Sequence, residues 1–128
     1  MHVISDGLYQ AGEFQVALLP TQELFDYSLE TFGYEHISTI HAGIDLGTVL
    51  SRLQRYGEAE TILVEALGYA DRILGEEHGF TVFGTNELAE VYNAQGNYSQ
   101  GEVYYLRGLQ VRERALGVEH ISLSLIHI

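Results

Sequence analysis

The sequence contains no cysteine, which excludes disulfides, thiolate metal sites and cysteine nucleophiles. No apolar run approaches the ~18 residues of a membrane-spanning helix. The first ten residues show no basic region followed by an apolar stretch, so no signal peptide is expected. These absences predict a chain that does not enter a membrane, and they favour a cytoplasmic location with its reducing conditions.

Lysine is also absent, and the six cations are all arginines, against 18 aspartate and glutamate residues. Without lysine these residues hold no phosphate-binding P-loop and no Schiff-base site. The lack of a basic patch argues against nucleic-acid binding, because no cluster of cations would displace the counterions. The acidic excess favours a basic or apolar partner, and a merely solvated acidic surface is the alternative.

An internal repeat fills most of the chain. The marker Gly-x-Glu-His recurs at Gly33, Gly75 and Gly117, so the period is 75 − 33 = 117 − 75 = 42 positions. The two full copies are identical at ten aligned positions. A fixed period of about 20–50 residues indicates stacked structural repeats. The expected organisation is a partial repeat over 1–31, full repeats over 32–73 and 74–115, and the start of another over 116–122.

Within each unit the apolar residues fall at helical spacing, which predicts a helix, a tight turn and a second helix. Helices are expected at 38–53, 56–73, 80–95 and 98–115, and small residues such as Gly47 and Ala59 mark positions where helices touch. In the partial repeat, Gly12 predicts a turn between helices over 1–10 and 14–31. Pro20 lies in the second of these and is expected to kink or shorten it.

The run Leu88-Ala89-x-x-Tyr92-x-x-x-Gly96-x-Tyr98-x-x-Gly101-x-x-x-Tyr105-x-x-Gly108-Leu109 resembles a tetratricopeptide repeat. The 42-residue period and the Leu-Gly-x-Glu-His linker are similar to the longer variety found in kinesin light chains. The resemblance implies an all-α fold, a right-handed α-solenoid of antiparallel helix pairs. It also implies a protein–protein interaction scaffold with no cofactor, rather than an enzyme.

In this family the first helix of each pair lines a concave groove. Carrying those positions over gives a candidate surface for a peptide or a partner helix; the alternative is that they form only the polar face of an amphipathic helix. The residues of this surface are His41, Ile44, Thr48, Ser51 and Arg52 in one repeat and Phe83, Asn86, Glu90, Asn93 and Ala94 in the next. Asparagine suits peptide recognition because its amide both donates to and accepts from an extended backbone.

Two other functions are alternatives to this one. One is the sensor array of a signalling NTPase whose catalytic domain lies outside this sequence. The other is a metal-dependent enzyme built on His36, His78 and His120. Neighbouring repeats place such residues ~10 Å apart, whereas zinc ligands each bind at ~2 Å. Local capping by each histidine is therefore favoured, and no catalytic, cofactor-binding or metal-binding residue is expected.

The two ends of the chain differ from the repeat pattern. Residues 123–128 resemble the translation of a sequencing adapter, and we expect them to be foreign to the natural protein; a genuine apolar tail that starts another helix is the alternative. The sequence then begins inside one repeat and stops soon after the start of another, as a fragment of a longer protein would. Because uncovered apolar faces promote association, we expect the isolated chain to be marginally stable and to self-associate through its uncapped ends.

Overall fold

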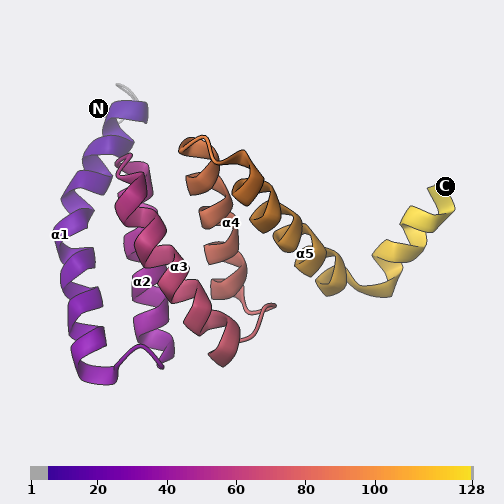
Figure 1. Cartoon of the computed structure of the whole chain (residues 1–128), viewed down its shortest axis with the longest axis horizontal. Coiled ribbons are helices and arrows are strands. Elements are labelled where there is room, and N and C mark those ends of the chain that lie inside the picture. Colours follow the sequence, from indigo (N-terminus) through magenta and orange to yellow (C-terminus); the bar gives the residue numbers. More distant parts are fainter. Residues whose placement is uncertain (1–5, 128) are drawn as a thin grey trace.

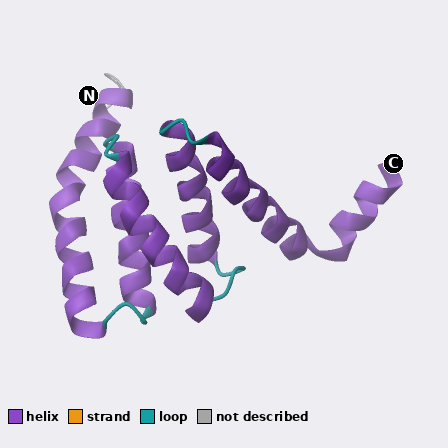
Figure 2. Cartoon of the chain, in the orientation of Figure 1, coloured by secondary structure: helices purple, strands orange, loops and turns teal. Residues whose placement is uncertain are grey.

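The computed structural model describes the backbone of residues 6–127 and the side chains of residues 13–114. This part of the chain consists of helices joined by short loops and contains no strand (Figures 1 and 2). The helices are α1 (Asp6–Phe32), α2 (Ile37–Arg52), α3 (Tyr56–Ile73), α4 (Gly79–Ala94) and α5 (Tyr98–His127). Consecutive helices run antiparallel and pack side by side, with α1 at one edge (Figure 1). The predicted all-α solenoid of helix pairs is confirmed.

The helices of the two full repeats lie where their apolar spacing predicts them. The bounds of α2, α3 and α4 agree with the predicted bounds to within one residue, and α5 begins at Tyr98 as expected. The signals that fix these bounds are local, because glycine and polar residues interrupt the helical pattern at each turn.

The helices at the two ends differ from the prediction. The turn expected at Gly12 does not form, because α1 is one helix from Asp6 to Phe32. A separate helix over 1–10 would be shorter than the ~12–15 residues at which an isolated helix becomes even marginally stable. Likewise α5 does not end at 115 but continues through the third marker to His127. The suspected foreign residues 123–128 lie beyond the residues whose side chains are described.

Pro20 does not end α1, which continues from there to Phe32. Proline has no N–H, so the carbonyl of Val16 loses its helical donor. Both residues lie on the exposed face of α1, where water can hydrogen-bond to that carbonyl. Solvent exposure therefore explains why the expected shortening is absent.

Residues with a left-handed backbone end the helices. Gly33 (φ 77°) and Gly75 (φ 93°) follow α1 and α3, and Gly96 (φ 83°) lies in the turn between α4 and α5. Gln54 occupies the position equivalent to Gly96 in the preceding repeat and has the same conformation, with φ 65°. The first full repeat thus has glutamine where the second has glycine in the same turn. Because a residue with a Cβ is strained in this region, the turn at Gln54 is the less favourable of the two.

Close approach of α2 and α3 depends on a glycine. A Cβ added to Gly47 would lie 2.5 Å from Cγ of Leu63, and Leu63, Ala59 and Ala66 are completely buried. The large side chain of one helix thus occupies the space left by the small residue of the other, as the alternation of small and large residues predicts. The core continues through Ile40, Ile44, Leu46, Leu88 and Val91.

We predict that Gln54→Gly stabilises the chain by about 1 kcal/mol, because it removes the left-handed strain of a residue with a side chain. Urea unfolding followed by circular dichroism measures the difference. The matched control is Gly96→Gln, which should destabilise by a similar amount. A Gln54→Gly chain that is no more stable than the original would contradict the assignment of strain to this turn.

Candidate protein-interaction surface

The predicted surface residues divide by exposure. The exposed ones are His41, Arg52, Phe83, Glu90, Asn93 and Ala94, and the half-buried ones are Thr48 and Asn86. Ile44 and Ser51 are buried. The hydroxyl of Thr48 donates to the carbonyl oxygen of Ile44 at 2.9 Å, so it is satisfied within α2. The structure therefore brings together only part of the predicted set on one open face.

Ile44 is a core residue because α4 covers it. It is only 1% exposed, and a Cβ added to Gly84 of α4 would lie 3.3 Å from its Cδ1. The position that lines a groove in an isolated helix pair is here the contact between two successive first helices. The aliphatic side chain of Ile44 was the feature of the sequence that could have predicted its burial.

The two asparagines lie toward α5. A Cβ added to Gly101 would lie 2.1 Å from Oδ1 of Asn93, and one added to Gly108 would lie 2.7 Å from Oδ1 of Asn86. Each amide therefore occupies the space that a side chain on α5 would need. This placement makes Asn86 and Asn93 part of the α4–α5 packing, and it sets them apart from the face shared by α2 and α4.

Aromatic rings of α2 and α4 form the open part of the surface. The imidazole of His41 stacks on the ring of Phe80 with centroids 4.1 Å apart and parallel planes. Phe83, one turn further along α4, is 44% exposed. The Nε2 of His41 also lies 3.3 Å from a carboxylate oxygen of Asp45. Phe80 was not among the predicted residues, although its spacing from Phe83 places it on nearly the same side of α4.

A buried carboxylate joins the two first helices. Glu87 of α4 is buried, and both of its oxygens accept hydrogen bonds from Arg52 of α2, at 3.0 and 3.2 Å. The exposed Glu90 lies 3.7 Å from the same guanidinium. Arg52 thus joins α2 to α4, a structural role that its predicted groove position did not indicate. Sequence reasoning missed Glu87, although an acid stands at the equivalent position of the preceding repeat, Asp45.

The marker histidines cap the first helix of each full repeat. The Nδ1 atoms of His36 and His78 accept hydrogen bonds from the backbone N–H groups of Ser38 and Phe80, at 3.0 and 3.1 Å. Each histidine is therefore the N-cap of the first helix of its repeat. The capping interpretation is confirmed for these two residues, and the side chain of His120 lies outside the described part.

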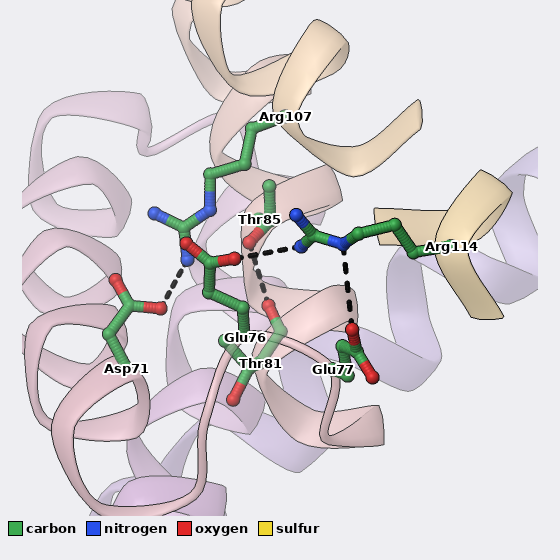
Figure 3. A network of polar contacts seen from close by, with 7 residues as sticks. All are labelled: Asp71, Glu76, Glu77, Thr81, Thr85, Arg107 and Arg114. Carbon is green, nitrogen blue, oxygen red and sulfur yellow. Dashed lines mark hydrogen bonds and ion pairs between the residues drawn. The ribbon is translucent and has the colours of Figure 1, made fainter. Parts of the chain in front are cut away.

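The marker glutamates pair with arginines near the ends of the second helices. Glu35 lies 4.0 Å from Arg72, and in the next repeat Glu77 lies 3.5 Å from Arg114. Figure 3 shows Arg114 directed toward both Glu76 and Glu77, with a hydrogen bond of 2.8 Å to Glu76. The repeated pair ties each second helix to the loop that begins its own repeat.

A neighbouring pair joins α5 to α3. Arg107 donates a hydrogen bond to the half-buried carboxylate of Asp71 (Figure 3). In the same region the hydroxyl of Thr85 donates to the carbonyl oxygen of Thr81 at 2.8 Å, which satisfies this buried hydroxyl within α4. Five of the six arginines therefore contact carboxylates, counting Arg55 with Glu58.

Among the residues whose side chains are described, no three His, Asp or Glu residues are grouped as metal ligands would be. Over that same part of the chain, none of the helices is long and apolar enough to span a membrane.

Comparison with known proteins gives the class. The tetratricopeptide repeat family matches at residues 39–79 and 85–122, which together make up more than half of the chain. The chain therefore belongs to the tetratricopeptide repeat family. No curated protein matches it.

A solved structure has a similar fold. The chain resembles the crystal structure of BtubC (BKLC) from P. vanneervenii, a kinesin-light-chain-like repeat protein, with a TM-score of 0.52 and 17% sequence identity. The likeness covers 83% of this chain and 59% of that one. At this level of identity the likeness concerns the fold, and it agrees with the resemblance that the repeat period indicated.

We predict that His78→Ala destabilises the chain by about 1 kcal/mol, because the first turn of α4 loses its cap. His78→Asn supplies an equivalent acceptor and should retain most of the stability. Urea unfolding of the three chains provides the comparison, and equal losses in both variants would show that capping is not the role of this residue.

We predict that Arg52→Ala destabilises the chain by about 3 kcal/mol, because it leaves the buried Glu87 without its cation. Adding Glu87→Gln to this variant should recover part of the loss, since a neutral amide needs no counter-charge. Thermal melts compare these chains with Arg55→Ala, whose partner Glu58 is exposed and whose loss should change little. The idea fails if Arg52→Ala melts no lower than Arg55→Ala.

Proposed function

We propose that this chain is a non-enzymatic, cytoplasmic scaffold that binds a peptide or a helix of a partner protein across α2 and α4. Tetratricopeptide repeats generally mediate protein–protein interaction, and the family is generally non-catalytic. The observation that carries the proposal is the open aromatic face of His41, Phe80 and Phe83, with the acidic Glu90 two turns after Phe83 on α4.

The chemistry of this face favours a partner with apolar and basic residues. Phe83 offers an exposed apolar ring, and covering this ring with a partner side chain lowers the free energy of the complex. Arg52 is already held by two hydrogen bonds to Glu87, so the more distant Glu90 keeps most of its capacity to pair with another cation. With 18 acids against six arginines, the chain also attracts a basic segment over longer distances.

A peptide library tests the proposal. We expect selection on the immobilised chain to enrich peptides that combine an aliphatic or aromatic residue with arginine or lysine. Phe83→Ala should weaken the binding of these peptides about tenfold, as truncation of a central contact residue does. Glu90→Gln should weaken it as well and should reduce its dependence on salt.

Val64→Ala is the matched control, because Val64 is an exposed apolar residue of α3 and lies outside the proposed face. The enriched peptides should bind this variant and the original chain equally well. Peptides that bind the Phe83→Ala and Glu90→Gln chains as tightly as the original would show that the binding face lies elsewhere.

A further inference from the structure

The packing of α2 over α3 and α4 shows which side chains fill the groove between those two helices. Ile44 of α2 packs against Gly84 of α4. Further along the same helix, Arg52 makes two hydrogen bonds to the buried Glu87 of α4. The covering helix thus supplies an aliphatic side chain and, two turns further on, an arginine.

The equivalent place one repeat earlier is an open groove. It lies between α1 and α2 and has a volume of about 280 Å³. Its wall on α1 is apolar, and the side chains of Leu24, Tyr27 and Phe32 are 55%, 60% and 47% exposed. In Figure 1, α1 stands at the outer edge of the stack. The groove is therefore accessible to a molecule that approaches from this edge.

The residues of α2 that line this groove are equivalent to the residues of α4 that α2 itself covers. Ala42 stands one period before Gly84, and Asp45 stands one period before Glu87. Asp45 is half-buried, and this burial raises the pKa of its carboxyl group, against a smaller opposing effect of His41. The Nε2 of His41 lies 3.3 Å from this carboxylate, whereas Glu87 has a bidentate arginine. The groove thus has a carboxylate that a partner's cation can pair with.

Residues of this chain in the same register do not fit the groove. The residues one period before Ile44 and Arg52 are His2 and Gln10, which supply neither an aliphatic side chain nor a cation. The helical backbone of α1 also begins at Asp6, so residues from there onward continue α1. Residues 1–10 therefore do not supply the aliphatic and cationic side chains that the charge and shape of the groove favour.

The size of Ala42 further restricts the occupant. A Cβ at Gly84 would come within 3.3 Å of the Cδ1 of Ile44, which is tight. Since Ala42 carries such a Cβ, a side chain without that terminal carbon fits the equivalent position better. Valine meets this requirement.

We propose that the groove between α1 and α2 binds an amphipathic helix of a partner protein. The helix presents a valine to Ala42 and, two turns later, an arginine to Asp45. This site is separate from the aromatic face proposed above, although His41 borders both. It would dock the partner at the edge of the array, side by side with α1 and α2.

The probe is a fluorescent peptide with the sequence of residues 37–54 carrying Ile44→Val, because α2 fills the equivalent groove. Fluorescence anisotropy measures its binding to the complete chain. We expect saturable binding that weakens about tenfold when the peptide arginine becomes glutamine or when the chain carries Asp45→Asn. Combining both changes should weaken binding little further, since each removes the same ion pair.

Three further variants test whether the peptide binds at this groove and not elsewhere on the chain. Asp26→Asn removes one charge from an exposed position on α1 outside the groove and should leave binding unchanged. Tyr27→Ala removes an exposed ring of the groove wall and should weaken binding without unfolding the chain. Phe83→Ala should leave binding of this peptide intact, which separates this site from the aromatic face. Absence of saturable binding, or equal losses with Asp26→Asn and Asp45→Asn, would overturn the proposal.

Discussion

A pair of short helices cannot bury its apolar face by itself, and the structure of this chain follows from that constraint. Within a pair, Leu63 of α3 fills the space that Gly47 of α2 leaves open. Between pairs, α4 covers Ile44 of α2 and places Glu87 against Arg52. Each helix in the middle of the stack is therefore stabilised from two sides, whereas α1 retains exposed apolar residues.

The Gly-x-Glu-His marker is explained by three separate tasks. Its glycine takes the left-handed conformation that ends the preceding helix, as Gly33 and Gly75 do. Its glutamate pairs with an arginine near the end of the second helix of its own repeat. Its histidine caps the first helix through Nδ1. The marker recurs because one short loop must end one helix, start another and stay attached to the pair it introduces.

The sequence predicted the helices of the full repeats because their signals are local. Helical spacing and glycine stops lie within each segment, and they placed α2, α3 and α4 to within one residue. The ends of the array were harder to predict, because whether Gly12 or Gly117 forms a turn depends on the helix that packs next to it. Both α1 and α5 continue past these glycines.

The candidate surface was predictable only in part, for a related reason. Family positions identify the side of a helix, and the side chains of His41, Phe83 and Glu90 on that side are exposed. They do not say which of those positions the next helix covers, and so Ile44 and Ser51 were included although both are buried. The aliphatic character of Ile44 and the recurring acid at Asp45 and Glu87 were the available clues to this contact.

The hydrogen-bonded ion pairs between segments of the array join residues less than one repeat period apart along the chain. Arg52 and Glu87 are 35 residues apart, Asp71 and Arg107 are 36, and Glu76 and Arg114 are 38. Each pair therefore forms without closing a long loop, and such local contacts favour rapid folding. The same locality shapes the response to mechanical load. Tension applied to the two ends would separate one unit after another, so the array would lengthen in steps.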